Sequence, residues 1–322
     1  MPKVSVIVPV YNTELYVERA IVSLMEQALD DVQFIIIDDG SKDNSLNIIK
    51  TVIARYPARQ KQVILITREN RGVAATRAQG MKLATGDYVI HLDSDDWAET
   101  TWLALMYDKA ISENADVVVC EHYRFLSDKI IHYKQMIKKN NIDNIRSLFR
   151  GNVSNANWDK LVRRNLFYEK NIIFYDGYDM GEDFLVTFLV LFFADNAVSI
   201  NKPLYYYNKE NESALTKDYT KKALYDLVEI TNVVERILIE NNILKAVEND
   251  FISFKLNTMS LFIVHLPFKI ETIEEVFDIY PDIHKNIFSS KMKLLIVLYL
   301  LKRMGLLCFA SFFVNARNWC KP

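Results

Sequence analysis

The sequence lacks the features that mark several large classes of protein. Only three of its 322 residues are cysteines, and their wide spacing forms neither a disulfide framework nor a C-x-x-C metal pattern. Lys and Arg (39) nearly balance Asp and Glu (41), for a net charge of −2, so the basic footprint of a nucleic-acid-binding protein is missing. The N-terminal segment lacks the long apolar stretch and small-residue cleavage site of a signal peptide. We therefore expect no nucleic-acid partner and a location in the reducing cytoplasm.

What is present is the composition of a folded protein. Half of the residues are hydrophobic and 25% are charged, which is ordinary for a globular chain. Short apolar runs alternate with helical periods through the first hundred residues, and we expect strands at residues 4–8, 34–37, 63–66 and 88–92. This alternation predicts an α/β fold, with a mainly parallel sheet flanked by helices.

Polar residues follow each of the four expected strands. Ligands of parallel sheets bind outside the carboxyl ends of the strands, so these residues should meet on one rim. Each loop alone also fits a turn or a helix cap, but gathered carboxylates repel one another unless a cation or hydrogen-bonding ligand lies among them. Four such loops together therefore favour a binding site. The candidates are Tyr11, Asn12 and Glu14; Asp38 and Asp39; Asn70, Arg71 and Gly72; and Asp93, Ser94 and Asp95.

The cluster Asp93-Ser94-Asp95 is the candidate metal site. It places two carboxylates two residues apart at the end of an apolar run. Hard oxygen ligands suit Mn²⁺ or Mg²⁺, and such an ion would stabilise a departing diphosphate as a Lewis acid. Arg71 and Arg77 are candidates for the phosphate oxygens, although Arg77 equally fits a solvated helix face.

Four segments carry a resemblance to a known family. They are VSVIVPVYNTE, IIDDGSKDNS, RENRGVAATRAQG and HLDSDDW, and together they resemble the N-terminal half of family 2 glycosyltransferases with the GT-A (Rossmann-like) fold. The resemblance covers about residues 3–97. It implies that Pro9, Tyr11 and Glu14 line the nucleotide pocket and that Asp39 binds the uracil or ribose region. It also implies that Asp93 contacts the ribose side and that Asp95 binds the metal.

A second resemblance, to the acceptor-side half of the same family, begins near Asn157. It rests on NWDKLVRRNLF, IIFYDGYDMGEDFLVTFL and PLYYYN, followed by Ser213. It implies that Asp183 is the catalytic base, which must take the proton from an acceptor hydroxyl. We place Glu182 beside it on the acceptor side, although both acids also fit a helix N-terminus. Trp158 fits either an acceptor sugar or the core, and its polar neighbours favour the sugar, whereas we assign Tyr205 to Tyr207 to strand packing.

Two regions are expected along the chain. Residues 1–215 should form the GT-A catalytic domain, with the nucleotide-sugar half in 1–97 and the acceptor half in 98–215. Residues 216–322 should form a helical C-terminal region. From Lys285 onward this region has seven basic residues and no acid, and its apolar runs 294–301 and 305–314 are too short to span a bilayer. An interfacial helix on anionic lipid and a buried helix hairpin both fit; we hypothesise peripheral contact with the inner face of the cell membrane.

These expectations combine into one function. We expect an inverting glycosyltransferase that moves a sugar from a nucleotide-sugar donor to a glycan or lipid-linked acceptor in surface polysaccharide biosynthesis. The resemblance implies that UDP is the donor nucleotide. Inversion follows from the resemblance and from a single candidate base without a nucleophile. The alternative is a catalytically silent sugar- or nucleotide-binding relative, which we would expect to have lost Asp95 or Asp183. A phosphatase of the haloacid dehalogenase kind is disfavoured because Ile37 stands where its nucleophile would be.

Overall fold

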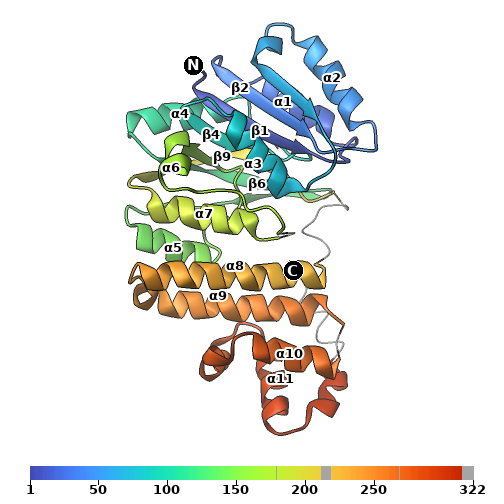
Figure 1. Ribbon diagram of the computed structural model, residues 1–322, viewed down its shortest axis with the longest axis vertical. Coiled ribbons are helices and arrows are strands. Elements are labelled where there is room, and N and C mark those ends of the chain that lie inside the picture. Colours follow the sequence, from blue (N-terminus) through green and yellow to red (C-terminus); the bar gives the residue numbers. More distant parts are fainter. Residues whose placement is uncertain (179, 212–218, 268, 314–322) are drawn as a thin grey trace. The chain divides into compact units, whose positions relative to one another are not determined.

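The computed structural model describes residues 1–178, 180–211, 219–267 and 269–313 (Figure 1). The chain divides into two compact units. The first consists of residues 1–178 and 182–212, and the second of residues 179–181 and 213–322. Ser213, Val314, Arg317 and Lys321 lie outside the described residues.

The first unit is built on one nine-stranded sheet. Strands β1, β2, β3 and β4 pair in parallel, and β6 pairs in parallel with β9, whereas β8, β5 and β7 add antiparallel pairs. The expected α/β fold is confirmed, and the sheet is mixed. Its order is β3 (Val63–Thr67), β2 (Val32–Asp38), β1 (Val4–Val10), β4 (Tyr88–His91), β8 (Lys160–Arg163), β6 (Val117–Leu126), β9 (Ala197–Asn208) and β5 (Trp97–Ala98), with β7 (Lys129–Tyr133) paired to β6.

Helices cover both faces of this sheet. Alternate residues of β1 belong to two different cores: Val6 and Val8 pack with α1 and α2, whereas Ile7 faces α3. This double burial is why the central strands read as continuous apolar runs. A Cβ atom on Gly80 of α3 would lie 2.4 Å from Ile7 Cγ2, so glycine is needed for the close approach of α3 to β1. The helices are α1 (Val17–Met25), α2 (Ser45–Arg55), α3 (Val73–Leu83), α4 (Trp102–Ser112), α5 (Asn141–Phe149), α6 (Arg164–Glu169) and α7 (Glu182–Phe193), with the short η1 (Gln60–Gln62).

The second unit is helical, as expected for the C-terminal extension. Its core joins Phe262 of α9, Phe277 of α10 and Leu295 of α11. Lys255 of α9 is buried, and its ammonium group pairs with Glu235 at 2.7 Å and Asp282 at 3.3 Å. Within the described residues, no helix has the length and apolar character needed to cross a membrane. The elements are α8 (Lys221–Glu240), α9 (Leu244–His265), α10 (Ile270–Ile279), η2 (Pro281–Ser289), α11 (Lys293–Arg303) and η3 (Leu307–Phe313).

Candidate active site

The loops after β1, β2 and β4 meet at the carboxyl ends of these parallel strands. Side-chain hydrogen bonds join them: Thr13 Oγ1 donates to Ser94 Oγ at 3.1 Å, and Glu14 accepts from the Asn44 N–H at 2.8 Å. Asn12, whose φ is +50°, accepts from the Lys42 N–H at 2.8 Å. The structure therefore brings together the loops that the sequence predicts on one rim. Ser94 is buried and links two of them, while Pro9 is half-buried and Tyr11 and Asn12 are exposed.

The loop after β3 is held by Asp39. Both carboxylate oxygens of Asp39 accept from the Arg71 N–H at 3.1 Å, and one accepts from the Gly72 N–H at 2.8 Å. Arg68 pairs with the same carboxylate at 2.8 Å. Gly72 has a φ of +86°, which favours glycine at this turn. Asp39 is thus an anchor of this loop, and a nucleotide contact by its side chain would have to replace or share these bonds.

Neighbouring residues of the same two loops differ in exposure. Asp38 is buried and accepts from the Ser41 N–H at 3.2 Å. Asn70 and Arg71 are exposed, and the Arg71 guanidinium lies 3.8 Å from the carboxylate of Asp176. The exposed side chains, unlike Asp38, are available to a ligand as the loops stand.

Arg77 lies at the centre of the acidic groups, and its position corrects a prediction. Its side chain is only 4% exposed, and one terminal nitrogen contacts Asp183 at 2.6 Å and Glu182 at 3.0 Å. The other terminal nitrogen contacts Asp93 at 2.9 Å. Burial among three carboxylates shows that the solvated-face alternative is wrong, whereas the phosphate contact of Arg77 stays a prediction. Arg77 joins the end of β4 to the start of α7.

Burial and this charge cluster set the pKa of Asp183, the candidate base. Burial raises the pKa of Asp183, as do the charges of Glu182 and Asp93, whereas Arg77 and the Asn157 amide lower it; the result is a pKa of about 7. Asn157 Nδ2 donates to Asp183 Oδ1 at 2.6 Å. The side chain of Asp183 is still 25% exposed, so it can reach a ligand. A carboxylate with a pKa near neutrality suits general-base chemistry.

The same cluster contains Glu182 and keeps the guanidinium of Arg77 protonated. Burial raises the pKa of Glu182 despite its ion pair with Arg77, and the residue is 7% exposed. Burial acts to lower the pKa of Arg77, but the charges of Asp183, Asp93 and Glu182 outweigh it and raise that pKa. The arginine therefore stays charged at any ordinary pH. An acceptor contact by Glu182 stays a prediction.

The acidic cluster after β4 is positioned by β9 and the residues that follow it. Asp96 is buried and accepts from the Tyr205 hydroxyl at 2.8 Å and the Asn208 N–H at 2.7 Å. The Tyr205 oxygen in turn accepts from the Asp93 N–H at 3.1 Å. Asn211 Nδ2 donates to Asp95 Oδ2 at 2.7 Å. Tyr205, Asn208 and Asn211 are thus missing from the predicted site, although Tyr205 and Asn208 stand in the PLYYYN segment of the resemblance.

The sequence of the chain is similar to those of known proteins. The sequence profile described as Glycosyl transferase family 2 matches residues 5–170, which is more than half of the chain. The chain belongs to glycosyl transferase family 2. It is 30% identical over 260 residues to the putative glycosyltransferase EpsH of Bacillus subtilis, covering 79% of this chain and 74% of EpsH.

Two solved structures of other proteins have the same fold as this glycosyltransferase. Residues 1–349 of S. aureus TarS, solved in complex with UDP-GlcNAc, match with a TM-score of 0.72 and 22% identity, over 96% of this chain and 89% of that one. The mannosyltransferase PcManGT of Pyrobaculum calidifontis, in complex with GDP-Man and Mn²⁺, matches with a TM-score of 0.57 and 15% identity, over 99% and 83%. The GT-A fold expected from the sequence is confirmed by these matches.

In the part of the chain that the structure describes, the glycosyltransferase has no group of three or more His, Cys, Asp or Glu side chains that could hold a metal ion. Asp95 nevertheless fits one side of a metal site. Its pKa is raised by burial and by the charge of Asp93, so a nearby cation would offset the repulsion between them. Mg²⁺ is commonly held by one or two carboxylates together with substrate phosphates and water, and Asp95 with Asp93 matches that donor set.

Trp158 of the glycosyltransferase corrects another prediction. The residue is 5% exposed and belongs to the main core. Its ring stacks on Tyr205, with centroids 4.3 Å apart, and meets the edge of His122 at 4.7 Å. Burial between these rings leaves it no face for an acceptor sugar, so the predicted acceptor contact is wrong. Its neighbour Asn157 is the residue of this segment that reaches the candidate base.

A buried ion pair supports that segment. Lys160 and Asp159 are 2.6 Å apart, with side-chain exposures of 2% and 0%. The Lys160 ammonium also donates to the carbonyls of Ser154 and Ala156 at 2.8 Å each. These bonds fix the backbone on which Asn157 stands.

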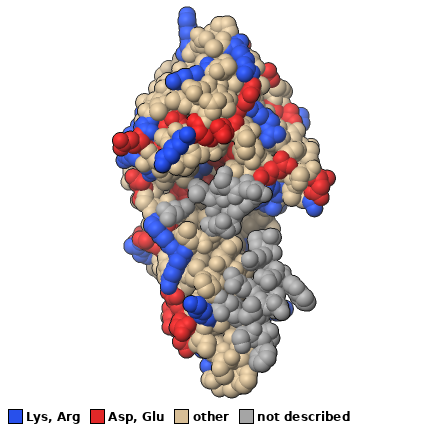
Figure 2. Space-filling model, turned by 90° about the vertical axis from the view of Figure 1, so that its right-hand side faces the viewer, with Lys and Arg blue, Asp and Glu red and all other residues tan. Residues whose placement is uncertain are grey.

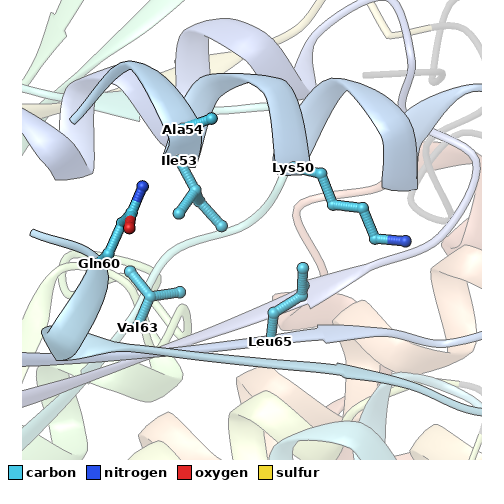
Figure 3. A pocket seen from close by; sticks show the side chains of 6 residues that line it. All are labelled: Lys50, Ile53, Ala54, Gln60, Val63 and Leu65. Atoms are coloured by element: carbon cyan, nitrogen blue, oxygen red, sulfur yellow. The ribbon is translucent and has the colours of Figure 1, made fainter. Parts of the chain in front are cut away.

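Elsewhere in this unit, a small pocket lies between α2 and the edge strand β3 (Figure 3). It contains none of the predicted site residues, and apolar side chains form much of its lining. It therefore has no evident link to sugar transfer. Its residues are Lys50, Ile53, Ala54, Gln60, Val63 and Leu65.

Proposed function

We propose that this glycosyltransferase moves a sugar from a nucleotide-sugar donor to a hydroxyl of a glycan or lipid-linked acceptor, with inversion, in surface polysaccharide biosynthesis. One observation carries the proposal: Asp183 is held at 2.6 Å by both Arg77 and Asn157 and has a pKa of about 7. TarS has been solved with UDP-GlcNAc and PcManGT with GDP-Man. UDP is therefore the first donor nucleotide to test, and GDP the second.

The proposed chemistry is a single displacement. Asp183 takes the proton of the acceptor hydroxyl while that oxygen attacks the anomeric carbon and the nucleoside diphosphate leaves from the opposite side. One displacement inverts the configuration at that carbon. Glu182, bound to Arg77, and Asp93, bound to the other arm of Arg77, would hold the guanidinium so that Asp183 stays in place.

The donor is proposed to bind on the rim formed by the loops after β1 to β4. Tyr11, Asn70 and Arg71 offer exposed side chains there, whereas Asp39 shapes the third loop. Asp95, with Asp93 beside it, would hold Mn²⁺ or Mg²⁺. Such an ion supplies Lewis-acid neutralisation of the charge on the leaving diphosphate. In this proposal residues 1–97 bind the donor, residues 98–215 carry the acceptor side, and residues 216–322 form a separate helical region.

The test separates binding from turnover. A panel of nucleotide sugars with and without Mn²⁺ is screened by thermal shift, because a ligand that binds the native state raises the melting temperature. The Asp183→Asn variant should keep donor affinity in calorimetry and lose about a hundredfold to ten-thousandfold in transfer rate. The exposed Asp108→Asn is the matched control. Transfer retained by Asp183→Asn would exclude Asp183 as the base, and donor binding without any turnover by the wild type would indicate a silent relative.

A further inference from the structure

Helix α11 buries one apolar face and exposes large apolar side chains on the other. Leu294, Leu295 and Leu298 face inward, and each is at most 6% exposed in the core of the second unit. At about 100° per residue, Lys293, Leu300 and the C-cap residue Met304 point the other way. Leu300 and Met304 are 38% and 60% exposed. Ile296 shares this outward side and is half-buried. A helix that buries one face normally carries mainly polar residues on the other, so the exposed apolar side chains beside Lys293 need an explanation.

The surroundings of this face are basic. Lys291 and Lys293 precede or begin the helix and Arg303 ends it, and all three are exposed. No Asp or Glu occurs from residue 283 to residue 322. Lys302 is different, because it pairs with Asp278 of α10 at 3.0 Å. Phe288 of η2, which is 56% exposed, adds an aromatic ring 6.4 Å from that of Tyr299.

We propose that the outer face of α11 and its flanking basic residues bind a lipid surface that carries anionic headgroups. The apolar side chains would enter the boundary of the acyl chains, and the three cations would meet the headgroups. With 11 residues, α11 is about half as long as a bilayer-spanning helix, so it lies along the surface. The two sequence-based alternatives thus describe two sides of one helix: the inner side is buried, and the outer side contacts lipid.

Lipid fits this face better than a second copy of the chain. Two copies meeting here would bring Lys291, Lys293 and Arg303 against the same cations of the partner, and like charges repel. The spaced positive charges around an apolar centre match anionic lipid instead. On the face seen in Figure 2, both Lys or Arg and Asp or Glu side chains occur among the described residues.

The experiment uses the full chain without substrates and sediments it with phosphatidylcholine vesicles, with or without phosphatidylglycerol. Binding is expected only with the anionic lipid and should weaken as salt rises. Replacing the three cations (Lys291→Glu, Lys293→Glu and Arg303→Glu) should weaken partition by about a hundredfold or more. The apolar pair Leu300→Gln and Met304→Gln should weaken it by about tenfold without changing the charge.

The matched control changes the same number of exposed lysines in the first unit: Lys50→Glu, Lys61→Glu and Lys82→Glu. This control should bind vesicles as the wild type does. Equal partition of the wild type onto neutral and anionic vesicles would overturn the proposal, as would equal loss in the control and the α11 variants. A dimer in analytical ultracentrifugation that the Leu300→Gln, Met304→Gln pair dissociates would assign the face to a second copy. Donor binding measured on the same samples tests the proposed function separately, because the vesicle assay contains no donor.

Discussion

Replacing Arg77 by methionine should change the pH dependence of the reaction, because Arg77 is the cation that opposes the high pKa of Asp183. Methionine keeps much of the side-chain volume but removes the charge that contacts Asp183, Glu182 and Asp93. With the arginine present, Asp183 has a pKa of about 7. The wild-type kcat/KM should therefore fall about tenfold for each pH unit below that value, since the base must be ionised in the free enzyme.

The size of the expected shift follows from the contact. A hydrogen bond to a charged group contributes ~1.5–3 kcal/mol, and one pKa unit corresponds to about 1.4 kcal/mol. Loss of the 2.6 Å contact between Arg77 and Asp183 should thus raise the pKa of Asp183 by about one to two units. The acid limb of the kcat/KM profile should move upward by the same amount, so that at neutral pH the variant is slower chiefly because its base is protonated.

The stability of the Arg77→Met variant should depend on pH with a definite sign. Removing one partner of a buried ion cluster costs ~3–5 kcal/mol. In the variant, the native state holds protons on Asp183 and Glu182 that the unfolded chain has released, so the free energy of unfolding falls as pH rises from about 4 toward the raised pKa. The deficit in melting temperature should therefore be larger at alkaline than at acid pH.

The assay is initial-rate transfer from pH 5 to pH 10 with the donor found in the thermal-shift panel, together with melting curves over the same range. Arg55→Met removes an arginine whose ion pair with Glu18 is about half exposed, and it is the matched control with an unchanged profile. An Arg77→Met variant that lost activity evenly at every pH, with its acid limb in place, would refute the assigned effect on Asp183.

Three further predictions rest on separate contacts. Asn157→Ala removes the 2.6 Å bond that lowers the pKa of Asp183, so the acid limb should rise by less than in Arg77→Met and kcat should fall about tenfold; an unchanged profile would contradict it. Asp95→Asn should abolish the part of the donor-induced thermal shift that depends on Mn²⁺, while leaving metal-independent donor binding, and a full Mn²⁺ response would exclude Asp95 as a ligand. Lys160→Met leaves Asp159 buried without its cation and should cost ~3–5 kcal/mol in urea unfolding, whereas Lys109→Met, at a side chain that is 35% exposed, should cost less than ~1 kcal/mol.

Much of the fold can be predicted because its first half is locally encoded. The expected strand at residues 4–8 is observed as Val4–Val10, and the one at 34–37 as Val32–Asp38. Both strands are buried on two faces, so their sequences are unbroken apolar runs. The rim loops could be predicted for the same reason, since the end of each run marks the carboxyl end of a strand.

The errors fall where a contact joins distant parts of the sequence. Arg77 meets Asp183 across 106 positions, and Tyr205 meets Asp96 across 109. A helical period shows which residues share a face of α3, but not that the start of α7 brings two acids to that face. The same holds for Trp158, whose polar sequence neighbours suggested exposure although Tyr205 covers its ring.

The arrangement of charges joins the proposed donor side of the site to the proposed base. One guanidinium binds Asp93 with one arm and Asp183 with the other, and the charge of Asp93 is one of those that raise the pKa of Asp183. Any positive charge that offsets Asp93 would lower that pKa, whereas the negative charge of a diphosphate would raise it. A donor bound together with its cation would then leave the base closer to its free-enzyme pKa than either one alone. The proton affinity of Asp183 is therefore a property of the whole cluster, which explains why Arg77 is placed among acids instead of on the solvated face of α3.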